Sequence, residues 1–153
     1  MQSLELKVPT PIVTALLAVC MWCIGSLPPH LPVPPLVRVS IALVILLMGI
    51  GFSVAGVVSF KRAKTTVNPL KPETTTSLVS SGVYRFTRNP MYVGMVFVLI
   101  AWSVYLSSLW TLIGPVMLLL YLTRFQIQPE ERALTTMFGA DFVAYQSKVR
   151  RWL

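Results

Sequence analysis

The sequence predicts an all-α integral membrane protein with about four transmembrane helices, the last two forming a hairpin, followed by a cytoplasmic amphipathic tail helix. Of its 153 residues, 55% are hydrophobic and only 12% are charged. Three runs contain no charged residue: residues 8–29, 39–60 and 91–123. A helix needs about 20 apolar residues to cross a hydrocarbon core of about 30 Å, and helices satisfy their own backbone hydrogen bonds in lipid. We therefore expect a single membrane domain over residues 1–153.

The lengths of the uncharged runs set the expected helix boundaries. The first two runs give transmembrane segments at about 9–27 and 36–61. As one helix, residues 91–123 would measure about 50 Å, which is more than tilting in a bilayer accommodates. They are therefore expected to form two segments, at about 90–107 and 111–127. The break is placed between Ser107 and Pro115, since serine caps helices and proline suits a first turn.

The connections between these segments differ in character. Residues 27–36 are rich in proline and are expected to form a stiff turn on the outer side. The only histidine of the chain, His30, lies there and is expected to be solvated, so no metal site is predicted. The cytoplasmic loop at about 62–89 is polar and longer than a simple connection requires, as functional or disordered loops often are.

The second segment carries small residues on one face. Gly49, Ser53 and Gly56 recur at helical spacing. Such a face lets a neighbouring helix approach closely, so we interpret it as a packing surface.

Positive charge is concentrated on one side of the predicted topology. The chain has 13 Lys and Arg against 5 Asp and Glu, a net charge of +8. Only Arg38 falls at the outer loop, so the positive-inside rule places both termini and the polar connections in the cytoplasm. Nucleic acid is not an expected partner, because no stacking aromatic residues alternate with these cations on a soluble module.

Residues 129–153 are predicted to form an amphipathic helix on the cytoplasmic membrane surface. Pro129 suits the first position of a helix, and Glu130 and Glu131 would then lie in its first turn, where the helix dipole favours negative charge. Hydrophobic residues recur every three or four positions as far as Trp152, with a bend expected near Gly139.

Two polar clusters bracket the predicted hairpin, at residues 85–92 and 124–131. The two ends of a hairpin lie on the same side of the membrane, so the clusters are expected to face each other. They offer these side chains: Arg85, Arg88, Asn89, Tyr92, Arg124, Glu130 and Glu131. Such a pocket suits a zwitterionic, nucleotide-like cofactor and an apolar substrate from the bilayer. Alternatively, the arginines only anchor the protein and the glutamates only begin a helix.

The pattern of these residues resembles the isoprenylcysteine carboxyl methyltransferase family of membrane enzymes and its relatives, the phospholipid N-methyltransferases. The family pattern is an Arg-His-Pro-x-Tyr-x-Gly block, a hydrophobic hairpin, a Glu-Glu pair and a Phe-Gly-x-x-Tyr-x-x-Tyr tail. The matching residues are Arg88, Asn89, Pro90, Tyr92, Gly94, Glu130, Glu131, Phe138, Gly139, Phe142 and Tyr145. The resemblance covers about residues 64–153. Asn89 replaces the family histidine and cannot titrate, and Phe142 replaces the first tyrosine of the tail.

The resemblance implies an S-adenosylmethionine-dependent methyltransferase with S-adenosylhomocysteine as product. Its acceptor would be a lipophilic or lipidated substrate that enters from the bilayer, among membrane lipids. The implied cofactor-binding residues are Tyr84, Arg88, Asn89, Pro90, Tyr92, Gly94, Glu130 and Glu131. The implied catalytic residues are Arg88, Arg124 and Glu131. A carboxylate acceptor would need no base, whereas an amine or thiol must lose a proton, for which Glu131 is the expected acceptor.

Two other functions are compatible with the same composition. Cys20 and Cys23 form a C-x-x-C pair in the first segment, as in four-helix membrane thiol oxidoreductases that pass electrons to quinones. Such relays usually need a second cysteine pair, and this chain has 2 cysteines. Both also fit as small apolar residues of a membrane helix. A non-enzymatic membrane subunit would keep the fold without methyl transfer.

Overall fold

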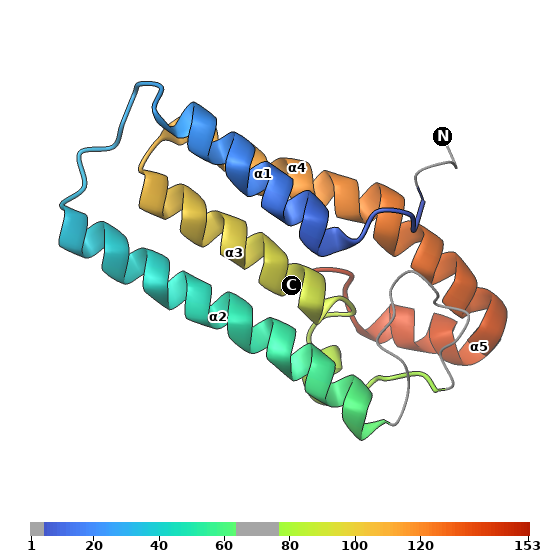
Figure 1. The fold of residues 1–153 in the computed structure, drawn as a ribbon. Helices are drawn as coiled ribbons and strands as arrows, with labels where there is room; N and C mark the ends of the chain where they lie inside the picture. Colours follow the sequence, from blue (N-terminus) through green and yellow to red (C-terminus); the bar gives the residue numbers. More distant parts are fainter. Residues whose placement is uncertain (1–4, 64–76) are drawn as a thin grey trace.

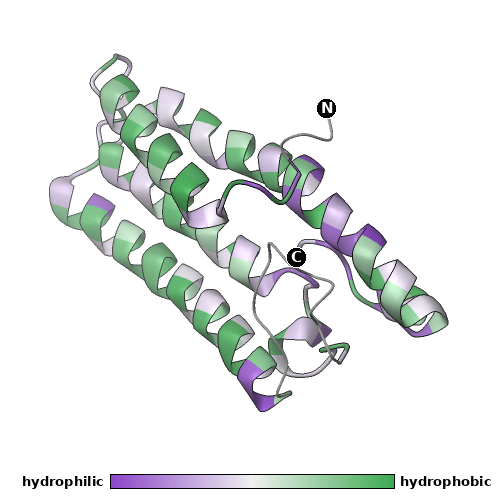
Figure 2. Ribbon diagram, turned by 45° about the vertical axis from the view of Figure 1, so that its right-hand side comes forward, coloured by the Kyte–Doolittle hydropathy of each residue, from purple (hydrophilic) through white to green (hydrophobic). Residues whose placement is uncertain are grey.

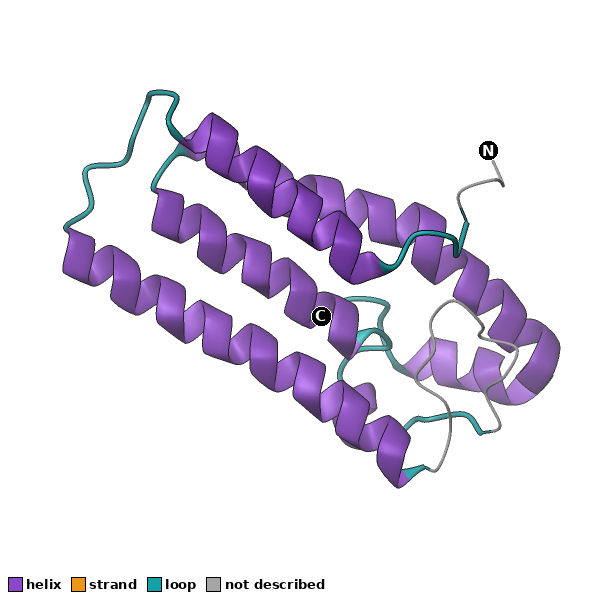
Figure 3. Cartoon of the chain, viewed as in Figure 1, coloured by secondary structure: helices purple, strands orange, loops and turns teal. Residues whose placement is uncertain are grey.

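The computed structural model describes residues 5–63 and 77–153, and every regular element within them is a helix (Figure 3). The α-helices are α1 (Thr10–Gly25), α2 (Pro35–Arg62), α3 (Pro90–Leu106), α4 (Ile113–Tyr121) and α5 (Gln128–Lys148). The 3-10 helices are η3 (Gly82–Arg85) and η4 (Leu109–Leu112), and the π-helical turn is η5 (Leu122–Ile127). The predicted all-helical fold class is confirmed for these residues.

The helices α1 to α4 run side by side as an elongated bundle (Figure 1). Proline occupies one of the first two positions of α1, α2 and α3, where its missing N–H costs nothing. The proline-rich connection and the turn between α3 and α4 meet at one end, where Ser107 Oγ donates to the carbonyl of Leu31 at 3.0 Å. Trp110 Nε1 donates to the carbonyl of Pro28 at 2.8 Å, so this end is closed by hydrogen bonds to the backbone.

The bundle helices consist largely of hydrophobic residues (Figure 2). Two helical stretches of the described chain are long and apolar enough to cross a membrane: α2, with 28 residues, and Leu109–Lys148, with 40. The apolar helices α1 and α3 are shorter, with 16 and 17 residues. Large hydrophobic side chains point outward, among them Leu36, Trp22 and Leu16, which are 79%, 66% and 61% exposed. Exposure on this scale marks a surface suited to lipid.

Packing inside the bundle follows two patterns. The buried side chains of Met21, Leu99, Leu118 and Leu122 join α1, α3, α4 and η5 in one core cluster. In contrast, α2 packs on α3 through small residues, and a Cβ on Gly94 would lie 2.5 Å from the carbonyl oxygen of Gly49. The small-residue face of the second segment is therefore confirmed as a packing surface.

Pro129 lies in the first two positions of α5 and Glu130 and Glu131 lie in its first turn, as expected, but α5 is not separated from the helix before it. Helix α4, η5 and α5 follow one another without a break, so Pro129 lies inside a continuous helical run. Proline has no N–H for the carbonyl of Phe125, four residues earlier, and its ring crowds that carbonyl. The helix accommodates the proline by widening into the π-helical turn η5 just before it.

The chain reverses at Gly139, which has φ 50° and ψ −122°, so the expected bend lies at this residue. After the reversal, α5 runs back toward the start of α3 (Figure 1). Helix α5 ends at Lys148. Residues 149–153 were expected to be helical, but they are not, and they extend across the end of the bundle.

Candidate active site

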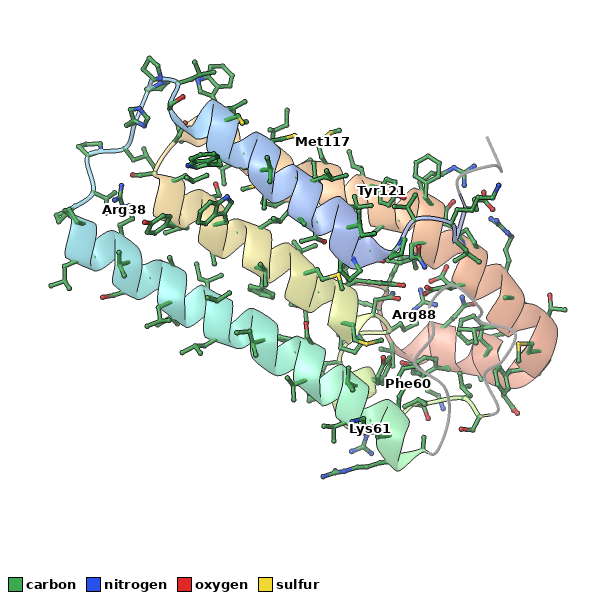
Figure 4. All side chains as sticks on the ribbon, viewed as in Figure 1. Arg38, Phe60, Lys61, Arg88, Met117 and Tyr121 are labelled. Carbon is green, nitrogen blue, oxygen red and sulfur yellow. The ribbon has the colours of Figure 1, made fainter. Side chains whose placement is uncertain are left out.

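The carboxylate of Glu131 joins parts of the chain that are far apart in the sequence. Its Oε1 lies 3.1 Å from Nη2 of Arg88, the residue two positions before α3. Arg151 donates to the same carboxylate twice, from Nε to Oε1 at 3.1 Å and from Nη2 to Oε2 at 2.7 Å. The side chains of Arg88 and Glu131 are only 12% and 15% exposed, so these charges interact more strongly than they would at the surface. Figure 4 shows Arg88 at the end of the bundle that α5 approaches, opposite Arg38.

The C-terminal segment is also tied to the start of α3 through its backbone. The N–H of Arg88 donates to the carbonyl of Arg150 at 3.0 Å. The carbonyl of Arg151 accepts from Asn89 Nδ2 at 2.9 Å and from Thr87 Oγ1 at 3.2 Å. Trp152 packs against the core cluster. Asn89, at the position of the family histidine, thus serves here as a donor that holds the chain end against the site.

Arg88 has hydrogen-bonding capacity that the described residues do not use. Its Nε and Nη1 are buried and have no hydrogen-bond partner among residues 5–63 and 77–153, while Nη2 reaches Glu131. A buried guanidinium nitrogen without an acceptor is costly, and a bound anionic group would satisfy it. Among the described residues, this is the feature that most directly indicates a ligand.

A second carboxylate, Glu130, lies in a neutral hydrogen-bonding environment. Its Oε1 accepts from the hydroxyl of Tyr92 at 2.5 Å and from Gln126 Nε2 at 3.0 Å. Burial raises the pKa of Glu130 from its ordinary 4.5 to about 7, and the charge of Glu131 adds to this rise, although both hydrogen bonds oppose it. Two adjacent glutamates therefore have different surroundings: Glu131 is paired with two cations, and Glu130 is near the point of titration at neutral pH.

The stability of the protein is expected to depend on pH through Glu130. Between pH 4.5 and about 7, the unfolded chain releases the proton of this carboxyl while the folded protein retains it. The contribution of Glu130 to stability is therefore greatest below pH 4.5 and is lost as pH rises to about 7. Thermal unfolding of wild type and Glu130→Gln across this range should show wild type losing stability relative to the variant. Parallel curves would contradict the raised pKa.

The structure brings most of the predicted residues together. Tyr84 is buried on η3, and its carbonyl accepts from the hydroxyl of Tyr145 at 2.7 Å. Burial raises the pKa of the Tyr84 phenol well above its ordinary value. Pro90 is buried at the start of α3, beside Asn89. Tyr92, Glu130 and Glu131 lie around the same end of the bundle.

Two predicted residues lie outside the cluster. Gly94 faces α2, where a Cβ would lie 2.1 Å from Ser53 Oγ, so its contacts are those of helix packing. Arg124 points to the N-terminal segment, where its Nη1 donates to Glu5 Oε1 at 2.8 Å. Its side chain is 42% exposed. The two polar clusters thus face each other through Arg88 and Glu131, without Arg124.

Sequence reasoning missed three contributors to the cluster. The sequence places Arg151 only among the many cations expected in the cytoplasm, and its patterns assign no role to Thr87 or Gln126. For Gln126 a signal was available, because a glutamine at the polar end of an apolar segment, four residues before a glutamate, can hydrogen-bond to it on one helical face. Nothing in the local pattern distinguishes Arg151 from Arg150.

A cleft of about 600 Å³ lies next to this cluster, between η3 and the part of α5 after Gly139. Its charged lining residues are Arg85, Asp141 and Lys148, and its apolar ones include Leu78, Ala144 and Val149. Tyr145 also lines the cleft and links its two sides through the hydrogen bond to Tyr84. The side chain of Phe86, next to Arg85 in the chain, is 72% exposed.

The other candidate site is the cysteine pair of α1, which a thiol oxidoreductase would use. Cys20 and Cys23 are free and exposed on the apolar outer surface of the bundle. In the described part of the chain, no three His, Cys, Asp or Glu side chains gather in a way that could hold a metal ion.

The apolar helical bundle and the charged cluster at one of its ends together indicate the class of protein. It is a helical membrane protein with a polar site at one end of its helices. A family model described as phospholipid methyltransferase matches residues 37–141. The chain belongs to this family of membrane methyltransferases, which is related to the isoprenylcysteine carboxyl methyltransferases, as the sequence motifs predicted. An uncharacterized protein of Haemophilus influenzae is 36% identical over 63 residues, which cover 41% of this chain and 100% of that protein. No solved structure matches the chain.

Proposed function

We propose that this protein transfers a methyl group from S-adenosylmethionine to a lipophilic acceptor at the cytoplasmic end of the bundle. The observation that carries the proposal is Arg88, a buried cation with two donor nitrogens that no described residue satisfies, beside the carboxylate of Glu131, which Arg88 and Arg151 hold in place. The motifs around Arg88 and Glu131 and membership in a methyltransferase family support it.

The residues present fit this cofactor. Nη1 of Arg88 would donate to its carboxylate and Nε to a second acceptor on the cofactor, because the N–H groups of Nε and Nη1 point in different directions and cannot form one forked pair. Glu130 or Glu131 would accept from its amino group or ribose hydroxyls, with Tyr84, Asn89 and Pro90 forming the surrounding wall. When bound, the cofactor supplies a methyl group that its sulfonium already activates. The chain's own task is then to orient the acceptor and to exclude water.

Of the two glutamates, Glu130 is the better proton acceptor. Both oxygens of Glu131 are engaged by guanidinium N–H groups, so Glu131 is suited to fixing Arg88 and Arg151. Glu130 has neutral partners and a pKa raised to about 7, which suits a general base at neutral pH. For an amine acceptor, the nitrogen would form the new bond to the methyl carbon as the bond from that carbon to the cofactor sulfur breaks. The proton of the nitrogen would pass to Glu130, and S-adenosylhomocysteine would be the leaving group. A carboxylate acceptor would need no proton transfer.

The cleft next to the cluster offers a place for the head group of the acceptor. Arg85 and Lys148 would attract a phosphate, and Asp141 an ammonium or hydroxyl. The exposed ring of Phe86 and the apolar lining would lie at the level of the lipid glycerol. A phospholipid therefore fits this cleft better than an isoprenylated protein end does, because an isoprenylated end carries no phosphate.

The proposed topology has four transmembrane segments, both termini in the cytoplasm, and the part of α5 after Gly139 on the membrane surface. The distribution of cations supports this orientation, as does the position of Arg38 at the opposite end from Arg88 (Figure 4). The helices α1 and α3 are short for a full crossing, so polar residues at the cytoplasmic end would lie near the lipid head groups.

Calorimetric titration of the detergent-purified protein with S-adenosylmethionine and S-adenosylhomocysteine tests the proposal. We expect saturable binding in the micromolar range, and Arg88→Ala and Glu131→Gln should each weaken it at least about tenfold, or about 1.4 kcal/mol. Arg62→Ala is the matched control, since Arg62 is an exposed cation at the cytoplasmic end of α2. Arg85→Ala should leave cofactor affinity unchanged and raise the KM for a phospholipid acceptor.

The titration, a turnover assay with lipid acceptors and cysteine alkylation together separate the alternatives. Folded protein that binds neither compound would contradict the methyltransferase proposal. Binding without turnover on any lipid would favour a non-enzymatic subunit. A redox-dependent change in the alkylation of Cys20 and Cys23 would reopen the thiol oxidoreductase alternative.

A further inference from the structure

The residues just before α1 contact the π-helical turn η5, which lies more than a hundred residues later in the chain. Glu5 Oε1 accepts from Nη1 of Arg124 at 2.8 Å, and Glu5 Oε2 accepts from Nη2 of Arg132. The N–H of Leu6 donates to the carbonyl of Phe125 at 3.2 Å. Two consecutive residues therefore contact η5 and the first turns of α5 at three points.

The Phe125 carbonyl is the group that Pro129 leaves without its usual helical donor, because that donor would be the missing N–H of the proline. Leu6 supplies an N–H from outside the helix. To do so it adopts a left-handed conformation, with φ 56°. A residue with a side chain holds this conformation only where its surroundings fix it. The N-terminal segment is thus fitted to this turn in particular.

The turn that this segment contacts carries part of the candidate active site. Gln126 lies within η5 and donates to Glu130, which also receives the Tyr92 hydroxyl. If the π-helical turn became α-helical, the register would shift by one residue, which rotates the following side chains by about 100°. Glu130 would then no longer face Tyr92, so the geometry of the site depends on what keeps the turn π-helical.

We infer that Glu5 is a positioning residue of the candidate active site. By holding Arg124 and Arg132, on either side of Pro129, it keeps the π-helical turn in the register that directs Gln126 and Glu130 toward Tyr92. This assigns a role to Arg124 as well: it acts through Glu5, outside the charged cluster. The inference rests on the proposed function only for the second of the two measurements below.

The test uses the full-length protein in lipid nanodiscs and compares Glu5→Gln, Glu5→Asp and Arg132→Gln with wild type. Lys7→Gln is the matched control, because Lys7 is an exposed residue two positions from Glu5.

The first measurement is the midpoint of the pH-dependent change in Tm that Glu130 contributes. The titratable groups that face Glu130, namely Tyr92 from α3, Tyr84 from η3 and the adjacent Glu131, are present in all variants. The second is the Kd for S-adenosylhomocysteine.

Glu5→Gln and Arg132→Gln are each expected to move the pH midpoint by at least about half a unit and to raise the Kd about fivefold. The double variant should change the midpoint and the Kd no more than either single variant does. Glu5→Asp, which keeps the charge, should retain part of the wild-type behaviour, and Lys7→Gln all of it. An unchanged midpoint in Glu5→Gln overturns the inference, whether or not Tm falls uniformly. If wild type does not bind S-adenosylhomocysteine, the proposed function fails and the midpoint alone decides this inference.

Discussion

Replacing Arg151 with glutamine is expected to weaken S-adenosylhomocysteine binding at least about tenfold, equivalent to about 1.4 kcal/mol. Arg151 donates to both oxygens of Glu131, and Glu131 in turn orients Arg88. Without the second cation, Glu131 can turn fully toward Arg88 and engage the N–H groups that would hold the cofactor carboxylate. Glutamine keeps much of the length of the side chain, so the loss reports on the charge and its fixed geometry.

The neighbouring Arg150 provides a matched control for this experiment. Its side chain is exposed and makes no hydrogen bond or ion pair within the described residues, although its backbone carbonyl accepts from Arg88. Arg150→Gln changes the net charge equally and should leave the affinity near that of wild type. Equal losses in the two variants would mean that Arg151 contributes only to the general positive charge of the chain end.

Replacing Gly94 with alanine is expected to destabilise the bundle by about 3 kcal/mol or more, at the upper end of the cost of overpacking. The added Cβ would lie 2.1 Å from Ser53 Oγ and 2.5 Å from the carbonyl oxygen of Gly49. A side chain such as serine can rotate away, but a helix carbonyl cannot, so α2 must move away from α3. Equilibrium unfolding in mixed detergent micelles measures the effect.

Two glycines of α2 calibrate this prediction for Gly94 of α3. A Cβ on Gly51 meets nothing within 4 Å, so Gly51→Ala should leave the free energy of unfolding nearly unchanged. A Cβ on Gly56 would lie 2.8 Å from Cγ of Met91, a side chain that can adjust in part, so Gly56→Ala should fall between the two. If Gly94→Ala unfolds like Gly51→Ala, the close contact between α2 and α3 does not exist in the membrane.

Some features of the site follow from local sequence patterns. Uncharged runs and their prolines predict where helices lie, because the cost of burying charge and the missing proline N–H act at each residue separately. The meeting of Arg88 and Glu131 could also be expected, since a hairpin returns the chain to the side where it entered. The small-residue face at Gly49 and Ser53 required only the helical period.

The sequence by itself determined that the chain is helical, apolar on its surface and charged at one end, since these depend on composition and period. Only the tertiary structure decided which arginine pairs with which glutamate: Glu5 pairs with Arg124 and Arg132, and Glu131 with Arg88 and Arg151. These partners are up to 127 residues apart, and every arginine attracts a given glutamate equally until packing fixes the distances between them. Pro129 shows the same limit, because its effect depends on whether neighbouring segments can satisfy the carbonyl it leaves. Here Leu6 does so, and the helix continues.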